Sequence, residues 1–104
     1  MKTMRAARVI CWVVTAIAGG PAAHAQDTAI VRGMAATCAN CHGTEGRSVS
    51  TVPGLAGTDK VYFTQQMKDF KAGTRPATIM HQIAKGYSDG QIDQLAGYFS
   101  ALRK

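Results

Sequence analysis

The sequence predicts a small all-α domain. Apolar side chains recur at intervals of three and four residues in its second half, and residues that cap or end helices flank these stretches. No segment alternates convincingly between polar and apolar residues, as a half-buried strand would. Residues 26–104 contain no repeat and no low-complexity linker, so we expect a single domain there.

Residues 1–25 have the order of segments that is typical of a secretory signal peptide. Basic residues come first, an apolar run over 9–18 follows, and Ala23-His24-Ala25 forms a small-residue cleavage site. An uncleaved membrane anchor is the alternative, but a span needs roughly 20 apolar residues and this run is shorter. We expect cleavage after Ala25 and export to the periplasm, so that Cys11 leaves with the signal.

The first helix of the expected domain begins after Asp27 or Thr28, either of which can cap it, and runs to about Ala36. Residues 43–57 follow as a glycine-rich loop with no clear period. A loop of this length is uncommon in a compact domain unless it wraps around something.

The second helix is expected over residues 59–72, with Thr58 as its N-cap and Gly73 as its stop. Three large apolar residues in it fall at helical spacing and define one apolar face: Phe63, Met67 and Phe70.

A short third helix over residues 78–85 is closed by Gly86. Ser88 with Gln91 three residues later is a capping-box pattern, which predicts a last helix over 89–102. Its buried stripe consists of four residues: Ile92, Leu95, Ala96 and Phe99.

The charge of the chain argues against nucleic-acid binding, and its size and cysteine content indicate a bound cofactor. The full chain has 12 Lys and Arg against 6 Asp and Glu, and loss of the signal leaves 9 against 6. No basic run or aromatic platform supports nucleic-acid binding. A domain this small buries only about 60% of its unfolded surface. One disulfide between Cys38 and Cys41 would close too small a ring to compensate, so a large apolar cofactor would complete the core better.

One motif carries specific chemistry: Cys38-Ala39-Asn40-Cys41-His42. The C-x-x-C-H pattern is the attachment signature of c-type haem, in which two thiols form thioethers with the vinyl groups and the histidine ligates the iron. The two intervening residues let both sulfurs reach the vinyl groups and place the next residue beneath the metal. The motif therefore predicts one covalent haem held by Cys38, Cys41 and His42.

Two other uses of the motif fit the chain less well. A thioredoxin-like redox pair would require a βαβ setting, which the expected helices do not provide. A zinc site needs about four ligands, and outside the signal His81 is the single further imidazole or thiolate in the sequence.

Over nearly all of residues 28–102 the chain resembles the class I c-type cytochromes. Within that class it is most similar to the small haem subunits of flavocytochrome c sulfide dehydrogenases and to related single-haem bacterial carriers. The matching pieces are spread along the chain: Cys38 to Gly43, Pro53 to Gly57, the Tyr62, Gln66, Phe70 and Gly73 pattern, Thr78 to Met80, and Ala84 to Asp89.

The resemblance implies a periplasmic electron carrier with one haem c, not an enzyme, and a flavoprotein sulfide dehydrogenase subunit as a candidate redox partner. No flavin or nucleotide fingerprint occurs in the sequence, so any sulfide chemistry would belong to that partner. The alternative is a haem enzyme or a small-ligand sensor whose sixth iron position is labile.

Met67, Met80 and His81 are the candidates for the sixth iron ligand. Met67 shares a helical face with two phenylalanines, which favours a place in the core. Met80 lies just after a proline-containing turn, and the class I pattern places the ligand there. His/Met ligation is common in c-type cytochromes. We therefore expect His42 and Met80 to ligate the iron and His81 to face solvent or the haem edge.

The resemblance also implies roles for Pro53 and Leu55. The backbone carbonyl of Pro53 would accept a hydrogen bond from the imidazole of His42, which orients the ring and tunes the metal. Leu55 would pack on the face of the haem, although an ordinary place in the core is nearly as consistent with the sequence.

Overall fold

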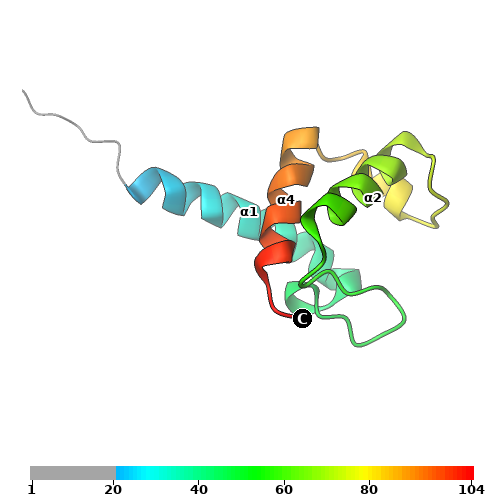
Figure 1. The fold of residues 1–104 in the computed structure, drawn as a ribbon, viewed down its shortest axis with the longest axis horizontal. Coiled ribbons are helices and arrows are strands. Elements are labelled where there is room, and N and C mark those ends of the chain that lie inside the picture. Colours follow the sequence, from blue (N-terminus) through cyan, green and yellow to red (C-terminus); the bar gives the residue numbers. More distant parts are fainter. Residues whose placement is uncertain (1–20) are drawn as a thin grey trace, which may run out of the picture.

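The computed structural model describes the backbone of residues 21–104 and the side chains of residues 27–104. Most of the expected signal segment, Cys11 included, lies outside the described residues. Helices account for all the regular structure in the described part, which confirms the all-α class (Figure 1). They are α1 (Pro21–His42), the 3-10 turn η1 (Thr44–Gly46), α2 (Lys60–Ala72), α3 (Met80–Ala84) and α4 (Asp89–Ala101).

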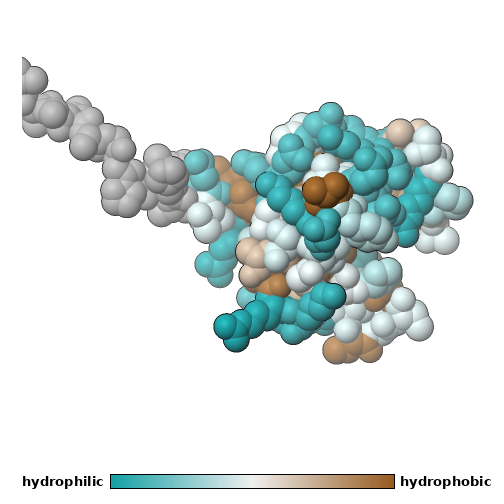
Figure 2. Space-filling model, viewed as in Figure 1, coloured by the Kyte–Doolittle hydropathy of each residue, from teal (hydrophilic) through white to brown (hydrophobic). Residues whose placement is uncertain are grey.

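Helix α4 is at the centre of the arrangement. It packs against α1 on one side and α2 on the other, while α2 also packs against α3 and α1 against η1. In Figure 1 the loop after η1 and the segment around α3 both project toward the same side of the molecule. On the face seen in Figure 2, hydrophobic residues form small, separate patches within a mostly polar or neutral surface.

Helix α1 is longer than the sequence predicted. An end at Ala36 was wrong, because α1 continues to His42 and thus includes both cysteines of the haem motif. No glycine or proline interrupts residues 37–42, and Gly43, at φ 83°, is the first residue that leaves the helix. At its other end α1 starts at Pro21, so it runs across the expected cleavage site.

Helix α2 begins one residue later than predicted. Asp59, not Thr58, is the N-cap, because its Oδ1 accepts a hydrogen bond from the backbone N–H of Tyr62 at 2.9 Å. Thr58 instead closes a turn in which its N–H donates to the carbonyl of Leu55 at 3.1 Å. The end is as predicted: Gly73 takes a left-handed conformation at φ 76°.

Helices α3 and α4 lie where the sequence placed them, with shorter bounds. Helix α3 starts at Met80 rather than residue 78, because Ile79 has non-helical dihedral angles. The capping box at the start of α4 is confirmed: Ser88 Oγ accepts from the N–H of Gln91 at 3.1 Å, and Gln91 Oε1 accepts from the N–H of Ser88 at 2.9 Å.

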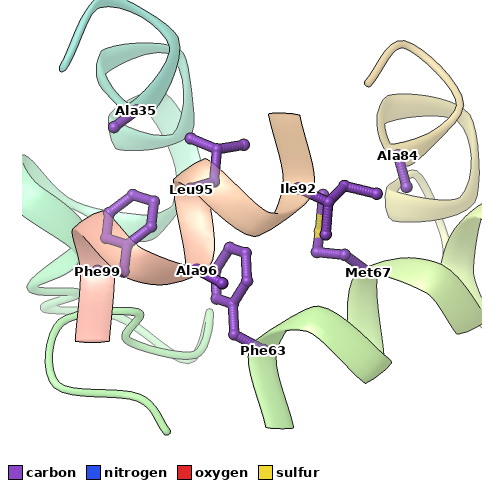
Figure 3. Packing of buried hydrophobic residues seen from close by; sticks show 8 residues of the cluster. All are labelled: Ala35, Phe63, Met67, Ala84, Ile92, Leu95, Ala96 and Phe99. Carbon is purple, nitrogen blue, oxygen red and sulfur yellow. The ribbon is translucent and has the colours of Figure 1, made fainter. Parts of the chain in front are cut away.

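The core lies between α2 and α4 (Figure 3). Every residue of the predicted stripe on α4 is fully buried, and Phe63 and Met67 of α2 face it. The rings of Phe63 and Phe99 stack with their centroids 5.7 Å apart. Ala35 of α1 and Ala84 of α3 complete this cluster, so all four α-helices contribute to one small core. The prediction that Met67 belongs to the core is therefore confirmed.

Candidate haem site

The last two turns of α1 carry the three residues of the haem motif. Cys38, Cys41 and His42 stand at positions i, i+3 and i+4, which places them on one side of a helix. Cys38 is half-buried and packs against the core, whereas Cys41 is exposed, and both are free thiols. Burial raises the pKa of the Cys38 thiol.

The imidazole of His42 is oriented by the loop that follows. His42 Nδ1 lies 2.6 Å from the backbone carbonyl oxygen of Pro53. Because a carbonyl oxygen can only accept, Nδ1 carries the hydrogen and donates it. The lone pair of the neutral ring is then on Nε2, the atom left for a metal.

Gly46 holds the Pro53 segment beside α1. The carbonyl oxygen of Gly46 accepts hydrogen bonds from the N–H groups of Leu55 at 2.7 Å and Ala56 at 3.1 Å. Gly46 has φ 73°, and a Cβ there would lie 2.9 Å from the Leu55 Cβ and 3.0 Å from the Phe99 ring. A side chain is excluded at this close approach, so the glycine is required. In the sequence, Gly46 was visible only as one of several loop glycines.

Leu55 and Met80 border the core from different elements. Both are partly buried and pack against it, Leu55 from the loop after η1 and Met80 from the first turn of α3. Beside Met80, the side chains of Ile79 and Ile83 are 55% and 38% exposed. The structure thus places apolar side chains around Met80 that the described chain does not cover.

His81 is half-buried, and its Nδ1 is a buried atom with no hydrogen-bond partner among the described residues. A polar atom in that state costs free energy. The ring therefore does not simply face solvent.

The site residues come together in two groups. The loop after η1 brings Pro53 against His42, next to both cysteines, whereas Met80 comes from α3, which packs on α2. An open hollow of about 560 Å³ lies on the loop, lined by Gly46, Arg47, Ser48, Gly54, Ala56, Gly57, Thr58, Asp59, Tyr62 and Lys104. It includes none of the predicted site residues.

The residues present fit a covalently attached haem. Two free thiols can form thioethers, His42 Nε2 and the Met80 thioether can ligate iron, and uncovered apolar side chains can contact a porphyrin.

The zinc and thioredoxin-like alternatives for the motif fit the structure less well. Within residues 27–104, no group of three or more His, Cys, Asp and Glu side chains is arranged to hold a metal ion, as zinc would need. The described part also has no strands for a thioredoxin-like setting. None of its helices is both long enough and apolar enough to span a membrane.

Comparison with known proteins identifies relatives with this chemistry. No family model matches the chain. The cytochrome subunit of sulfide dehydrogenase from Chlorobaculum tepidum is 41% identical over 71 residues, which cover 68% of this chain and 64% of that protein. Cytochrome c-554(548) from Halomonas halodenitrificans is 33% identical over 81 residues, which cover 74% of this chain and 98% of that protein.

A solved structure has the same fold. It is a cytochrome c4 of Acidithiobacillus ferrooxidans, with a TM-score of 0.65 and 35% sequence identity over 78% of this chain. The match spans half of that cytochrome c4. Because one relative is matched over nearly its full length and the fold agrees, this chain belongs to the class I c-type cytochromes, whose cofactor is covalently bound haem c.

Proposed function

We propose that this chain is a periplasmic electron-transfer protein in which Cys38 and Cys41 attach one haem c, and His42 and Met80 ligate its iron. The bound haem supplies a metal centre that takes up and releases one electron. The chain's own residues would hold that centre and supply the ligands of its iron. The proposal includes cleavage of the signal after Ala25, which would deliver residues 26–104 to the compartment where haem c is attached.

The hydrogen bond from His42 Nδ1 to the Pro53 carbonyl oxygen, 2.6 Å long, carries this proposal. It selects the tautomer whose Nε2 is free for iron, and it restrains the ring before any metal arrives. A histidine held in this way, four residues after one thiol and directly after another, has the chemistry of a proximal haem ligand.

Met80 is the proposed sixth ligand because of its place in the fold. It begins α3, packs partly against the core and lies between two exposed isoleucines, whereas Met67 is enclosed between α2 and α4. With His42 and Met80 both holding the iron, the haem would have no open position for a substrate and would supply electron exchange alone. This ligation therefore supports a carrier over a haem enzyme or sensor.

The proposed partner oxidises sulfide, because the Chlorobaculum tepidum relative is named the cytochrome subunit of sulfide dehydrogenase. The resemblance to the haem subunits of flavocytochrome c sulfide dehydrogenases implies that this partner would be a flavoprotein. Oxidation of sulfide to sulfur releases a pair of electrons, whereas a chain with one haem accepts them singly. The partner would therefore hold the second electron in its own cofactor, which a flavin can do.

The test begins with the full chain expressed in a host that attaches haem c. We expect an intact mass equal to residues 26–104 plus one haem, and a low-spin ferric spectrum with the weak long-wavelength absorption of sulfur-to-iron charge transfer. On mixing with the flavoprotein and sulfide, the haem should become reduced. Sulfide in catalytic amounts should not reduce the cytochrome alone.

Two outcomes would contradict the proposal. A mass equal to the bare polypeptide would exclude covalent attachment. High-spin ferric haem that readily binds added ligands would exclude Met80 as a stable ligand and favour the enzyme or sensor. The double variant Cys38→Ser, Cys41→Ser is the control, because it keeps the rest of the chain and cannot form the thioethers.

A further inference from the structure

A side-chain hydrogen bond joins α1 to the segment that follows α3. Thr37 Oγ1 and Tyr87 Oη lie 3.0 Å apart, although the two residues are 50 positions apart in the sequence. Thr37 Oγ1 also donates to the carbonyl oxygen of Met34 at 2.7 Å. A hydroxyl has one hydrogen, so Thr37 must accept and Tyr87 must donate in the contact between them.

Both ends of this hydrogen bond are tied to helices. Thr37 lies on α1 directly before Cys38, and the same helix runs on to His42. Tyr87 is tied to α3 because its N–H donates to the carbonyl of Ala84 at 3.2 Å, and Ala84 is fully buried in the core. The segment from Met80 to Tyr87 can therefore move little without straining this bond.

The main helix packing links the two parts through α4 and α2. Helix α1 packs on α4, whereas α3 packs on α2, and α2 meets α4 through the core. The Tyr87 hydroxyl thus reaches directly from the segment carrying Met80 to the helix carrying His42. Its ring is half-buried and packs against the core, so loss of the hydroxyl alone should leave the ring in place.

We propose that Tyr87 is a positioning residue: by donating to Thr37, it sets the separation between the α1 helix and the α3 segment and so keeps the Met80 sulfur on the iron. This inference rests on the proposed function, in which His42 and Met80 would both hold the iron. Without the hydrogen bond, the α3 segment should move away from α1 more often and release Met80.

Competition with imidazole in the ferric holoprotein measures that release. An added ligand binds only when Met80 has left, so its apparent affinity rises with the fraction of open protein. A partly exposed hydrogen bond contributes toward the low end of its usual range, so Tyr87→Phe should tighten apparent imidazole binding by roughly twofold to fivefold. The sulfur-to-iron absorption should also disappear at a temperature below the loss of helical circular dichroism.

Matched variants separate this role from general packing. Tyr98→Phe removes the hydroxyl of another half-buried tyrosine, one that packs edge-on against Phe99, and should leave imidazole binding unchanged. Thr37→Val should reproduce the effect of Tyr87→Phe, while Thr37→Ser should retain wild-type binding. The double variant of Tyr87→Phe with Thr37→Val should bind imidazole no more tightly than either single variant.

The outcomes distinguish the positioning role of Tyr87 from the assignment of Met80 as a ligand. If Tyr87→Phe and Tyr98→Phe both bind imidazole as the wild type does, while Met80→Ala abolishes the sulfur-to-iron absorption, the positioning role is wrong and the ligand assignment stands. If Met80→Ala leaves that absorption unchanged, the proposed ligation is wrong, and this inference falls with it.

Discussion

The two halves of this small molecule differ in how well the chain covers its own apolar residues. Between α2 and α4, Phe99, Ile92 and Leu95 have no exposed surface. Around the start of α3, by contrast, Ile79 is 55% and Ile83 38% exposed. Isolated exposed apolar residues are ordinary, but here they flank the proposed iron ligand. This comparison supports the proposal that polypeptide alone completes the core between α2 and α4, whereas a bound haem c would cover the residues at the start of α3.

The largest expected effect comes from preventing haem attachment. In the double variant Cys38→Ser, Cys41→Ser we expect no cooperative thermal unfolding by far-ultraviolet circular dichroism, because the α2 and α4 core is too small to stabilise the chain alone. Cys11→Ser is the matched control, since that cysteine belongs to the expected signal, and it should yield normal holoprotein. A double variant that melts at the wild-type temperature would break the distinction between the two halves.

The next largest effect on stability is expected from truncating a side chain in the core between α2 and α4. Phe99→Ala removes a fully buried ring that stacks on Phe63, and we expect a loss of about 3 to 5 kcal/mol in the free energy of unfolding by denaturant titration. The control Val49→Ala alters a fully exposed side chain and should change stability by less than about 0.5 kcal/mol. A small effect at Phe99 would mean that this half is not close-packed.

Met67 lies in the buried core and Met80 beside the exposed isoleucines, so variants of these two residues compare the two parts of the molecule directly. Met67→Ala should lower the free energy of unfolding by ~2 to 5 kcal/mol, because the side chain is buried, while the ferric spectrum stays unchanged. Met80→Ala should instead abolish the sulfur-to-iron absorption and let added ligands bind. Both variants are measured as holoproteins by denaturation and absorption. A spectral change in Met67→Ala together with an unaltered Met80→Ala would reverse the ligand assignment.

The smallest expected effect concerns the start of α2. Asp59→Ala removes the side chain that accepts from the N–H of Tyr62 and should cost about 1 kcal/mol. Thr58→Ala is the control. The sequence pattern favours Thr58 as the N-cap, but in the structure Asp59 has that role, so Thr58→Ala should cost less than Asp59→Ala. Equal losses in both variants, measured by denaturant titration, would argue that the helix begins at Thr58 in solution.

The helix boundaries show which parts of the fold could be predicted from the sequence. Where local chemistry decides, as at the Ser88 capping box and Gly73, the predicted helix ends were confirmed. The end of α1 was predicted too early, because nothing local distinguishes Ala36 from the residues that follow it. At α2, Thr58 and Asp59 are both good caps by residue type. The choice between them depended on the turn that Thr58 makes with Leu55.

The candidate haem site likewise has features that the sequence determined and features that depended on the tertiary structure. By itself the sequence determined the class of cofactor and the stripe of α4, because thioether attachment needs a fixed local spacing and burial follows helical periodicity. Only the tertiary structure revealed Gly46 as the anchor of the Pro53 loop and the contact between Thr37 and Tyr87. Such contacts join residues far apart in the chain, and their distances depend on how α1, α3 and α4 pack together, which no local pattern encodes.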